Sequence, residues 1–169
     1  MNVAGLDLST RAAAGVMLPL GWDGDFSQAR SLVVGEPLRR NATDAERARR
    51  TENIALPLVT FCRTNNVQIA FIESYGFNQS HAAHTLGEVG GVVRLELLRA
   101  GIEIRTAQMS SARKMLLGKL PRADVKMVVY STVRAAGATF ETADEADAFA
   151  ALNWGMSELG GYCFAQVAA

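Results

Sequence analysis

The sequence predicts an α/β protein in which a five-stranded mixed sheet carries helices on both faces. Two observations lead to this prediction. Short apolar runs separated by turn residues occupy the beginning of the chain, which is typical of an antiparallel meander. After them, apolar segments of strand length alternate with longer segments of helical spacing, as in β-α-β units. A meander joined to such units gives a sheet of mixed strand direction.

The meander is expected to contain three strands, over residues 3–8, 13–20 and 30–35. Between the first two strands, Thr10-Arg11 has turn chemistry. Between the second and third, the stretch 21–25 supplies glycines and aspartates, which favour turns.

A long helix is predicted over residues 43–65. Thr43 and Glu46 form a capping box at its start, and apolar residues follow at helical spacing. Pro57 lies inside this segment and is expected to kink or split the helix. The strongly apolar stretch 67–73 then predicts a buried fourth strand.

The segment 80–100 has an apolar stripe of helical spacing, and a short fifth strand is expected over 102–106. Gly87 and Gly91 lie one turn apart in this helix and permit another backbone to approach closely.

Three helical segments are expected to close the chain, over 110–117 as one or two turns, 123–136 and 143–158. Thr142 and Glu145 form a second capping box, at the start of the last of them.

Length and composition are those of one ordinary globular domain, residues 1–169, with 49% apolar and 20% charged residues. No apolar run approaches the roughly 20 residues that a membrane span needs. The first residues lack the pattern of a signal peptide. Cys62 and Cys163 are too few for a disulfide framework or a zinc site. We therefore expect a reducing, cytoplasmic setting and no membrane partner.

The formal net charge is zero, from 17 basic and 17 acidic residues, which disfavours a dedicated nucleic-acid binder. The basic residues nevertheless gather in two segments, where they could follow a phosphate backbone or form solvated helix faces. The first segment contains Arg39, Arg40, Arg47, Arg49 and Arg50. The second contains Arg113, Lys114, Lys119, Arg122 and Lys126.

Four acidic residues border or interrupt apolar runs that are expected to be buried. Asp7 lies near the end of the first strand, Glu73 ends the fourth, and Asp144 and Asp147 share one face of the last helix. Buried carboxylates need a partner, and sites in α/β sheets form beyond the carboxyl ends of parallel strands. Each acid alone has an ordinary explanation as a turn, cap or surface residue. Together, in this element order, they are expected to converge.

Converging carboxylates repel one another unless their pKa values rise or cations neutralise them. Oxygen ligands of this kind suit Mg²⁺, or Mn²⁺ in its place, rather than zinc. Two such ions about 4 Å apart can activate a water and stabilise the leaving oxygen in phosphodiester cleavage. The residues alone therefore predict metal-dependent phosphodiester chemistry.

Three motifs resemble those of the RuvC family of Holliday junction resolvases, within the RNase H-like superfamily. They occur in order over nearly the whole chain. The resemblance implies an RNase H-like fold with strand order 3-2-1-4-5, and a member this compact also fits a phage-encoded resolvase. The motifs are Val3 to Ser9 around Gly5 and Asp7, Ile72-Glu73 followed by Tyr75 and Phe77, and Asp144-Glu145-Ala146-Asp147-Ala148.

The resemblance implies a Mg²⁺-dependent endodeoxyribonuclease of DNA recombination and repair, which cleaves four-way junctions and other branched DNA. A homodimer would face its two sites toward the two strands to be cut, and the helix over 80–100 would contribute to the dimer interface. Gly87 and Gly91 would suit that contact, although packing of this helix on its own sheet explains them equally well. The implied catalytic residues and ligands of two Mg²⁺ ions are Asp7, Glu73, Asp144 and Asp147.

The resemblance also implies basic residues around the penultimate helix. Lys126 is the expected catalytic lysine, because a lysine beside the metals can bind the scissile phosphate or stabilise its developing charge. The basic candidates could instead be surface residues, and the aromatic ones could anchor their loop in the core rather than stack on a junction base. The further candidates for DNA contact are Lys114, Lys119, Arg122, Tyr75 and Phe77.

Two alternatives stay open. The chain could be an RNase H-like nuclease that acts on RNA–DNA hybrids or structured RNA. It could also be a non-catalytic junction-binding protein with a degenerate site, and the four intact carboxylates argue against that alternative.

Overall fold

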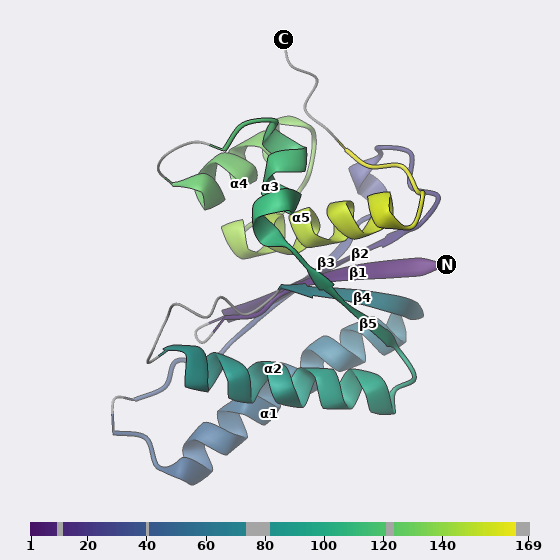
Figure 1. The fold of residues 1–169 in the computed structure, drawn as a ribbon. Helices are drawn as coiled ribbons and strands as arrows, with labels where there is room; N and C mark the ends of the chain where they lie inside the picture. Colours follow the sequence, from purple (N-terminus) through teal and green to yellow (C-terminus); the bar gives the residue numbers. More distant parts are fainter. Residues whose placement is uncertain (10–11, 40, 74–81, 121–123, 165–169) are drawn as a thin grey trace.

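The computed structural model describes residues 1–9, 12–39, 41–73, 82–120 and 124–164. Its centre is a five-stranded sheet of order β3-β2-β1-β4-β5 (Figure 1). β2 runs antiparallel to β1 and β3, whereas β4 is parallel to β1 and to β5. The predicted mixed sheet and its strand order are confirmed. The strands are β1 (Asn2–Asp7), β2 (Ala12–Pro19), β3 (Arg30–Gly35), β4 (Val67–Glu73) and β5 (Glu103–Ala107).

The helices form a layer on each face of the sheet (Figure 1). One layer contains α1 (Asp44–Thr64) and α2 (Ala82–Arg99). The other contains α3 (Met109–Leu117), α4 (Val125–Ala135) and α5 (Ala143–Glu158). A short 3-10 helix, Phe26–Gln28, lies between β2 and β3. Within the described ranges, no helix is both long and apolar enough to cross a lipid bilayer.

Alternate residues of the central strand β1 enter different cores. Ala4 and Leu6 belong to the core shared with α1 and α2, whereas Val3 belongs to the core shared with α5. Side chains alternate along a strand, so Gly5 and Asp7 lie on the same face as Val3. This alternation directs the acid at the end of β1 toward α5.

α5 lies directly against the sheet because two glycines leave room for it. A Cβ atom at Gly5 would lie 2.0 Å from the carbonyl oxygen of Ala148 on α5. A Cβ atom at Gly155 of α5 would lie 2.3 Å from the ring of Phe71 in β4. The sequence pattern predicts one buried stripe on this helix, but α5 is buried along most of its length because α3 and α4 cover its other side.

The expectation that Pro57 could split the first long helix is wrong. α1 continues from Asp44 to Thr64 through Pro57. Pro57 itself is exposed, whereas Ile54 and Leu58 beside it are fully buried. The proline removes a backbone donor on the solvent side of the helix, and packing of its neighbours keeps the helix continuous.

Candidate functional site

The carboxyl ends of β1 and β4 bring Asp7 and Glu73 together. The two strands are parallel neighbours, and Leu6 pairs with Ile72. Asp7 and Glu73 follow these paired residues, and both lie on the α5 face of the sheet. Asp7 is only 5% exposed, and Glu73 is partly buried. The strand register therefore places two carboxylates side by side at one end of the sheet.

The start of α5 carries the other two acids. Thr142 is the N-cap, and Glu145 completes a capping box with it, as the sequence predicts. Asp144 lies in the first helical turn, at the positive end of the helix dipole. Asp147 is 1% exposed, so its charge depends on partners inside the protein.

One lysine ammonium marks the point where three of these carboxylates converge. Nζ of Lys126, on α4, donates hydrogen bonds to Oδ2 of Asp7 at 2.8 Å and to Oδ1 of Asp144 at 2.5 Å. The same nitrogen lies 3.4 Å from Oδ2 of Asp147. The Lys126 side chain is 36% exposed, so it reaches the acids while keeping contact with solvent. Three elements, β1, α4 and α5, thus meet at a single nitrogen atom.

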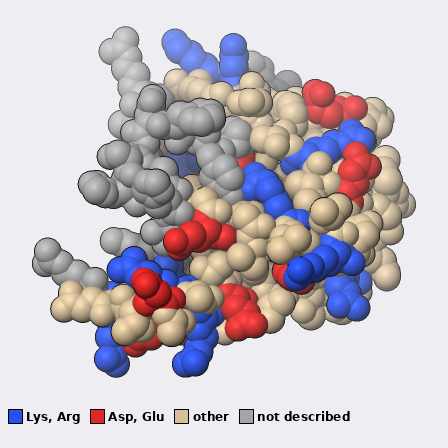
Figure 2. Space-filling model, turned by 60° about the horizontal axis from the view of Figure 1, so that its bottom comes forward, with Lys and Arg blue, Asp and Glu red and all other residues tan. Residues whose placement is uncertain are grey.

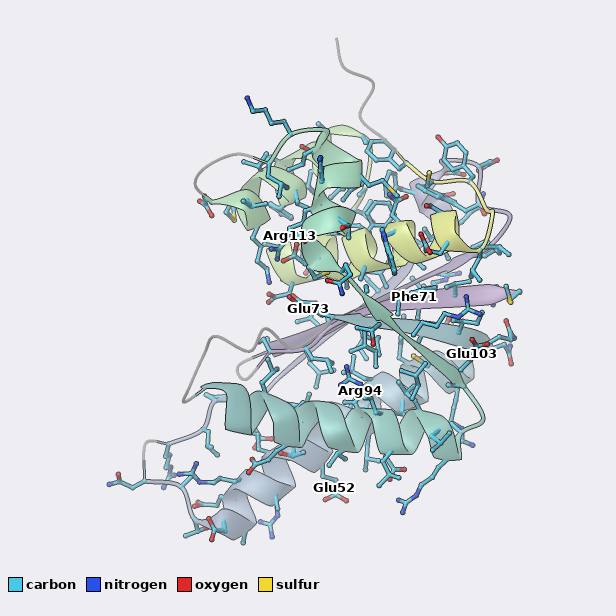
Figure 3. The ribbon with its side chains drawn as sticks, in the orientation of Figure 1. Glu52, Phe71, Glu73, Arg94, Glu103 and Arg113 are labelled. Atoms are coloured by element: carbon cyan, nitrogen blue, oxygen red, sulfur yellow. The ribbon has the colours of Figure 1, made fainter. Side chains whose placement is uncertain are left out.

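Arg113, on α3, is a site residue that the sequence indicates only as a member of the second basic segment. Its guanidinium donates two hydrogen bonds to Asp147, from Nε to Oδ1 at 3.0 Å and from Nη2 to Oδ2 at 2.6 Å. Figure 3 shows Arg113 and Glu73 on the same side of the sheet. The helical spacing of α3 could have indicated Arg113 as a site residue. Met109, Ala112 and Leu116 form the buried face of this helix, and Arg113 lies next to that face. A two-pronged arginine of this kind fixes a carboxylate in position as well as neutralising it.

Burial and mutual repulsion alter the acid–base properties of the cluster. Burial, followed by the charge of Asp7, raises the pKa of Glu73 to about 7. Burial also raises the pKa of Asp7, although Lys126 opposes that effect. Burial alone would favour the neutral amine of Lys126, but the carboxylates of Asp7 and Asp144 outweigh it and raise its pKa. The carboxylates therefore favour a cation at this point, and near pH 7 a fraction of the Glu73 side chains stays protonated.

The donor set fits Mg²⁺ once the lysine is displaced. Among the described residues, no group of three acidic, histidine or cysteine side chains is arranged to hold an ion directly. The ammonium of Lys126 lies at the point where the oxygens of Asp7, Asp144 and Asp147 converge. If it withdrew, carboxylate oxygens would face that point, and these are the ligands that Mg²⁺ prefers. Glu73 lies beside Asp7 as a fourth candidate ligand.

The other predicted contact residues are less closely placed. Lys114 and Lys119 are exposed on α3 and directly after it, and no ion pair or hydrogen bond joins them to the acids among the described contacts. Tyr75, Phe77 and Arg122 lie outside the described residues, so their predicted DNA contacts stay predictions.

No family model and no curated protein matches the sequence. Among solved structures, Thermus thermophilus RuvC in complex with a Holliday junction substrate matches with a TM-score of 0.67 at 16% identity, over 95% of this chain and 96% of that chain. Fowlpox virus resolvase in complex with Holliday junction DNA matches with a TM-score of 0.54 at 9% identity, over 94% and 99% of the two chains. A yeast mitochondrial Holliday junction resolvase matches with a TM-score of 0.52 at 10% identity, over 91% and 78%.

The chain has the fold of RuvC. The resemblance that the three motifs indicate is thereby confirmed in architecture, across junction-resolving nucleases from a bacterium, a virus and a mitochondrion. Sequence identities this low show the fold alone, and one fold can host several activities. The roles of individual residues therefore rest on the geometry of the acid cluster.

Proposed function

We propose that this RuvC-like protein is a metal-dependent endonuclease that resolves four-way DNA junctions by paired phosphodiester cleavage. One observation carries the proposal. Asp7, Asp144 and Asp147, from β1 and α5, converge on the single ammonium of Lys126 at the carboxyl end of the sheet. That arrangement concentrates negative charge where the fold class places its sites. The junction as substrate is supported by the RuvC and fowlpox resolvase structures, which hold Holliday junction DNA.

Each residue has a distinct task in the proposed reaction. Asp7, Glu73, Asp144 and Asp147 would hold two Mg²⁺ ions, which would supply an activated water and stabilise the leaving oxygen. Arg113 keeps the carboxylate of Asp147 in one orientation through its two hydrogen bonds. Lys126, released from the carboxylates, would bind the scissile phosphate and neutralise charge that develops on it.

A homodimer is part of the proposal, and the outer stripe of α2 supports it. Gly87, Gly91, Leu95 and Leu98 follow one another at helical spacing, and the two leucines are 45% and 68% exposed. Among the described residues, a Cβ atom at either glycine would meet no atom within 4 Å, so packing of α2 on its own sheet does not explain these glycines. The stripe instead offers a narrow apolar surface that a second copy of α2 could approach closely.

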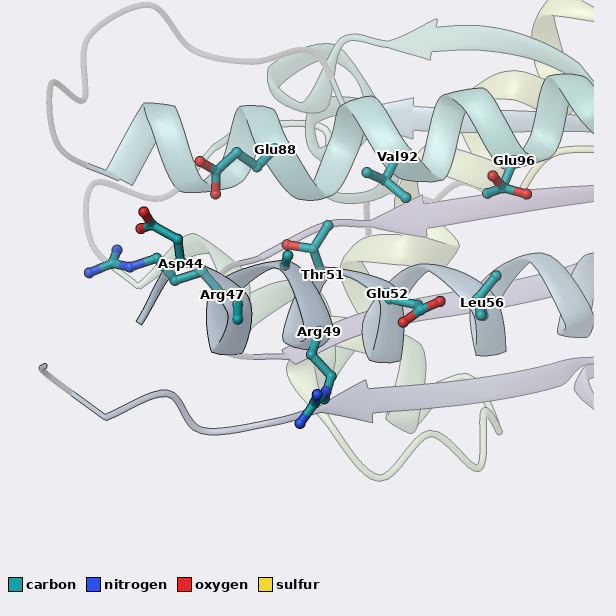
Figure 4. Close-up of a pocket in the computed structure, with 11 residues that line it drawn as sticks. Asp44, Arg47, Arg49, Thr51, Glu52, Leu56, Glu88, Val92 and Glu96 are labelled. Carbon is teal, nitrogen blue, oxygen red and sulfur yellow. The ribbon is translucent and has the colours of Figure 1, made fainter. Parts of the chain in front are cut away.

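The surface beside this stripe is compatible with self-association. A groove of about 850 Å³ lies between α1 and α2, away from the acid cluster (Figure 4). Arg47 and Arg49 line it from α1, and Glu88 and Glu96 line it from α2. Figure 2 shows basic and acidic side chains interspersed on the face that it displays. A two-fold interface sets such a surface against itself, so opposite charges can pair across it.

The proposal is tested by offering the purified protein a synthetic four-way junction beside duplex, flap and RNA–DNA hybrid substrates, with Mg²⁺ or Mn²⁺. We expect the junction to be cut in two strands, and Asp7→Asn to abolish cleavage while junction binding persists. Cleavage confined to the hybrid would support an RNase H-like activity instead. Junction binding without cleavage by the parent protein would support a binding module. Full cleavage by Asp7→Asn would overturn the assignment of the site.

A further inference from the structure

Glu145 lies between the two acids of α5 and makes more contacts than a helix cap requires. Its side chain is buried, and its carboxylate accepts four hydrogen bonds. Oε2 accepts from the backbone N–H groups of Glu141 and Thr142, at 2.9 and 2.8 Å, and from the Thr142 hydroxyl at 2.9 Å. Oε1 accepts from the hydroxyl of Ser31, on β3, at 2.7 Å. The cap of α5 is thus tied to a strand 114 residues away in the sequence.

The capping box of α1 shows what an ordinary cap needs. There Glu46 accepts from the backbone N–H and the hydroxyl of Thr43, at 2.7 and 2.9 Å. Both residues belong to the helix start, and Glu46 is exposed. The two boxes share their chemistry, but only the box of α5 has a hydrogen bond to the sheet among the described contacts. That extra bond is therefore not required for capping.

The hydrogen bond from Ser31 joins α5 to a row of paired residues that runs across β3, β2 and β1. The same row contains Gly5, against which α5 packs closely. Ser31 pairs with Val16 across β3 and β2, and Val16 pairs with Gly5 across β2 and β1. Gly5 is the residue at which Ala148 of α5 touches the sheet. One row of the sheet thus holds α5 at two points, on β1 and on β3. Two fixed points restrict both sliding and rotation of a helix, whereas one point restricts only its distance.

We propose that Ser31 and Glu145 form a positioning pair that sets the place of the first turn of α5 over the sheet. Asp144 precedes Glu145 directly, and Asp147 follows it by two residues. Any shift of this turn moves both carboxylates relative to Asp7, which is fixed on β1. The functional effect of this pair rests on the proposed function, because the pair would hold Asp144 and Asp147 at the distance from Asp7 that metal ions require. Outer partners that bond a metal ligand directly typically alter metal affinity or activity by about 10- to 100-fold, so this pair, which acts through the backbone of α5, should have an effect at the lower end of that range.

The decisive variant is Ser31→Ala, because it removes the hydrogen bond between Ser31 and Glu145 and leaves the capping box of α5 intact. The matched control is Ser27→Ala, since the exposed Ser27 also donates to a carboxylate, that of Asp25 at 2.6 Å. Ser27 lies in the 3-10 helix that follows β2, at the end of the sheet opposite Asp7. Ser31→Thr keeps a hydroxyl on a strand and should restore the parent behaviour. Mn²⁺ binding by calorimetry, kcat and KM on the four-way junction, and amide hydrogen exchange over 143–147 are measured on the full chain.

We expect Ser31→Ala to weaken Mn²⁺ binding and to lower kcat by about tenfold each, with KM unchanged and with faster exchange over 143–147. Ser27→Ala and Ser31→Thr should match the parent protein in all four measurements. Parent-like Mn²⁺ affinity, kcat and exchange in Ser31→Ala would overturn the positioning pair. If the parent protein itself neither binds Mn²⁺ nor cleaves, the proposed function fails, and the exchange over 143–147 alone then decides for or against the pair.

Discussion

Glu73 is held in a protonation state unlike that of a glutamate in water. Burial and the charge of Asp7 raise its pKa from 4.5 in the unfolded chain to about 7 in the folded protein. Between these two values the folded state keeps a proton that the unfolded state has released. The free energy of unfolding therefore decreases as pH rises from 4.5 to about 7, and the loss is complete above that range. Without metal, the ionised Glu73 is a source of instability.

Glu73→Gln should therefore stabilise the metal-free protein at pH 8 and change it little at pH 5. Glutamine is a neutral mimic of the protonated acid, so it removes a penalty that exists only where Glu73 is ionised. We expect the Tm in the presence of a chelator to rise by a few degrees at pH 8. Glu52→Gln, on the exposed side of α1, serves as the control and should show no such dependence on pH. An equal effect of Glu73→Gln at both pH values would contradict the raised pKa.

Arg113 neutralises an acid that is almost fully enclosed. Arg113→Met should leave Asp147 with Lys126 at 3.4 Å as its remaining cationic partner among the described contacts. We expect a loss of about 2 kcal/mol in the free energy of unfolding, less than for a fully buried pair because the arginine is partly exposed. Added Mg²⁺ should recover part of this loss, since the ion would take over the neutralisation of Asp147. Denaturant unfolding with and without Mg²⁺ measures both effects, and an Mg²⁺-independent loss would argue against metal binding at Asp147.

At the scale of the elements, sequence periodicity predicts which segments form strands and helices but not how closely they pack. Both capping boxes, and the strands that end at Asp7 and Glu73, are visible in the sequence because they depend on local spacing. α3 extends over nine residues where one or two turns are expected. The partners of Arg113 and Glu145 lie on elements that are distant in the sequence, so helical phase can place Arg113 beside a buried face but cannot identify Asp147 as its partner.

The contact between α5 and β1 depends on the absence of a side chain at Gly5. Gly5→Ala places a Cβ atom against backbone and not against a flexible side chain, so the helix itself must move. We expect a loss of about 3 kcal/mol or more and reduced cleavage, because the displaced helix carries Asp144 and Asp147. Gly21→Ala is the matched control, because a Cβ atom there would meet no atom of the described residues within 4 Å and the change should alter stability little. Thermal unfolding distinguishes them, and equal stability of the two variants would contradict the close packing of α5.

At the scale of the whole molecule, the acid cluster and the proposed dimer surface lie on opposite faces of the sheet. α3, α4 and α5 lie on one face of the sheet and bring Asp144, Asp147 and the basic partners to the end where Asp7 and Glu73 lie, whereas α2 lies on the opposite face (Figure 1). The outer side of α2 carries the exposed apolar stripe. Paired cleavage needs two sites, and one chain has one cluster of these acids. Dimerisation and chemistry should therefore be separable by mutation, because the stripe and the cluster share no residue.

Leu98→Glu provides that separation. The side chain is 68% exposed, so the change should have little effect on the stability of the monomer, but in a dimer it would bury a charge in an apolar contact. We expect sedimentation to show monomers at concentrations where the parent protein is dimeric. On a plasmid with an extruded cruciform, the variant should yield nicked circles, since a monomer cuts one strand, whereas the parent protein should yield linear product. Val33→Glu, at an exposed position of the edge strand β3, controls for the added charge and should leave both assembly and product unchanged. A dimeric Leu98→Glu that yields linear product would place the interface elsewhere, and a monomeric variant that still linearises the plasmid would remove the need for paired sites.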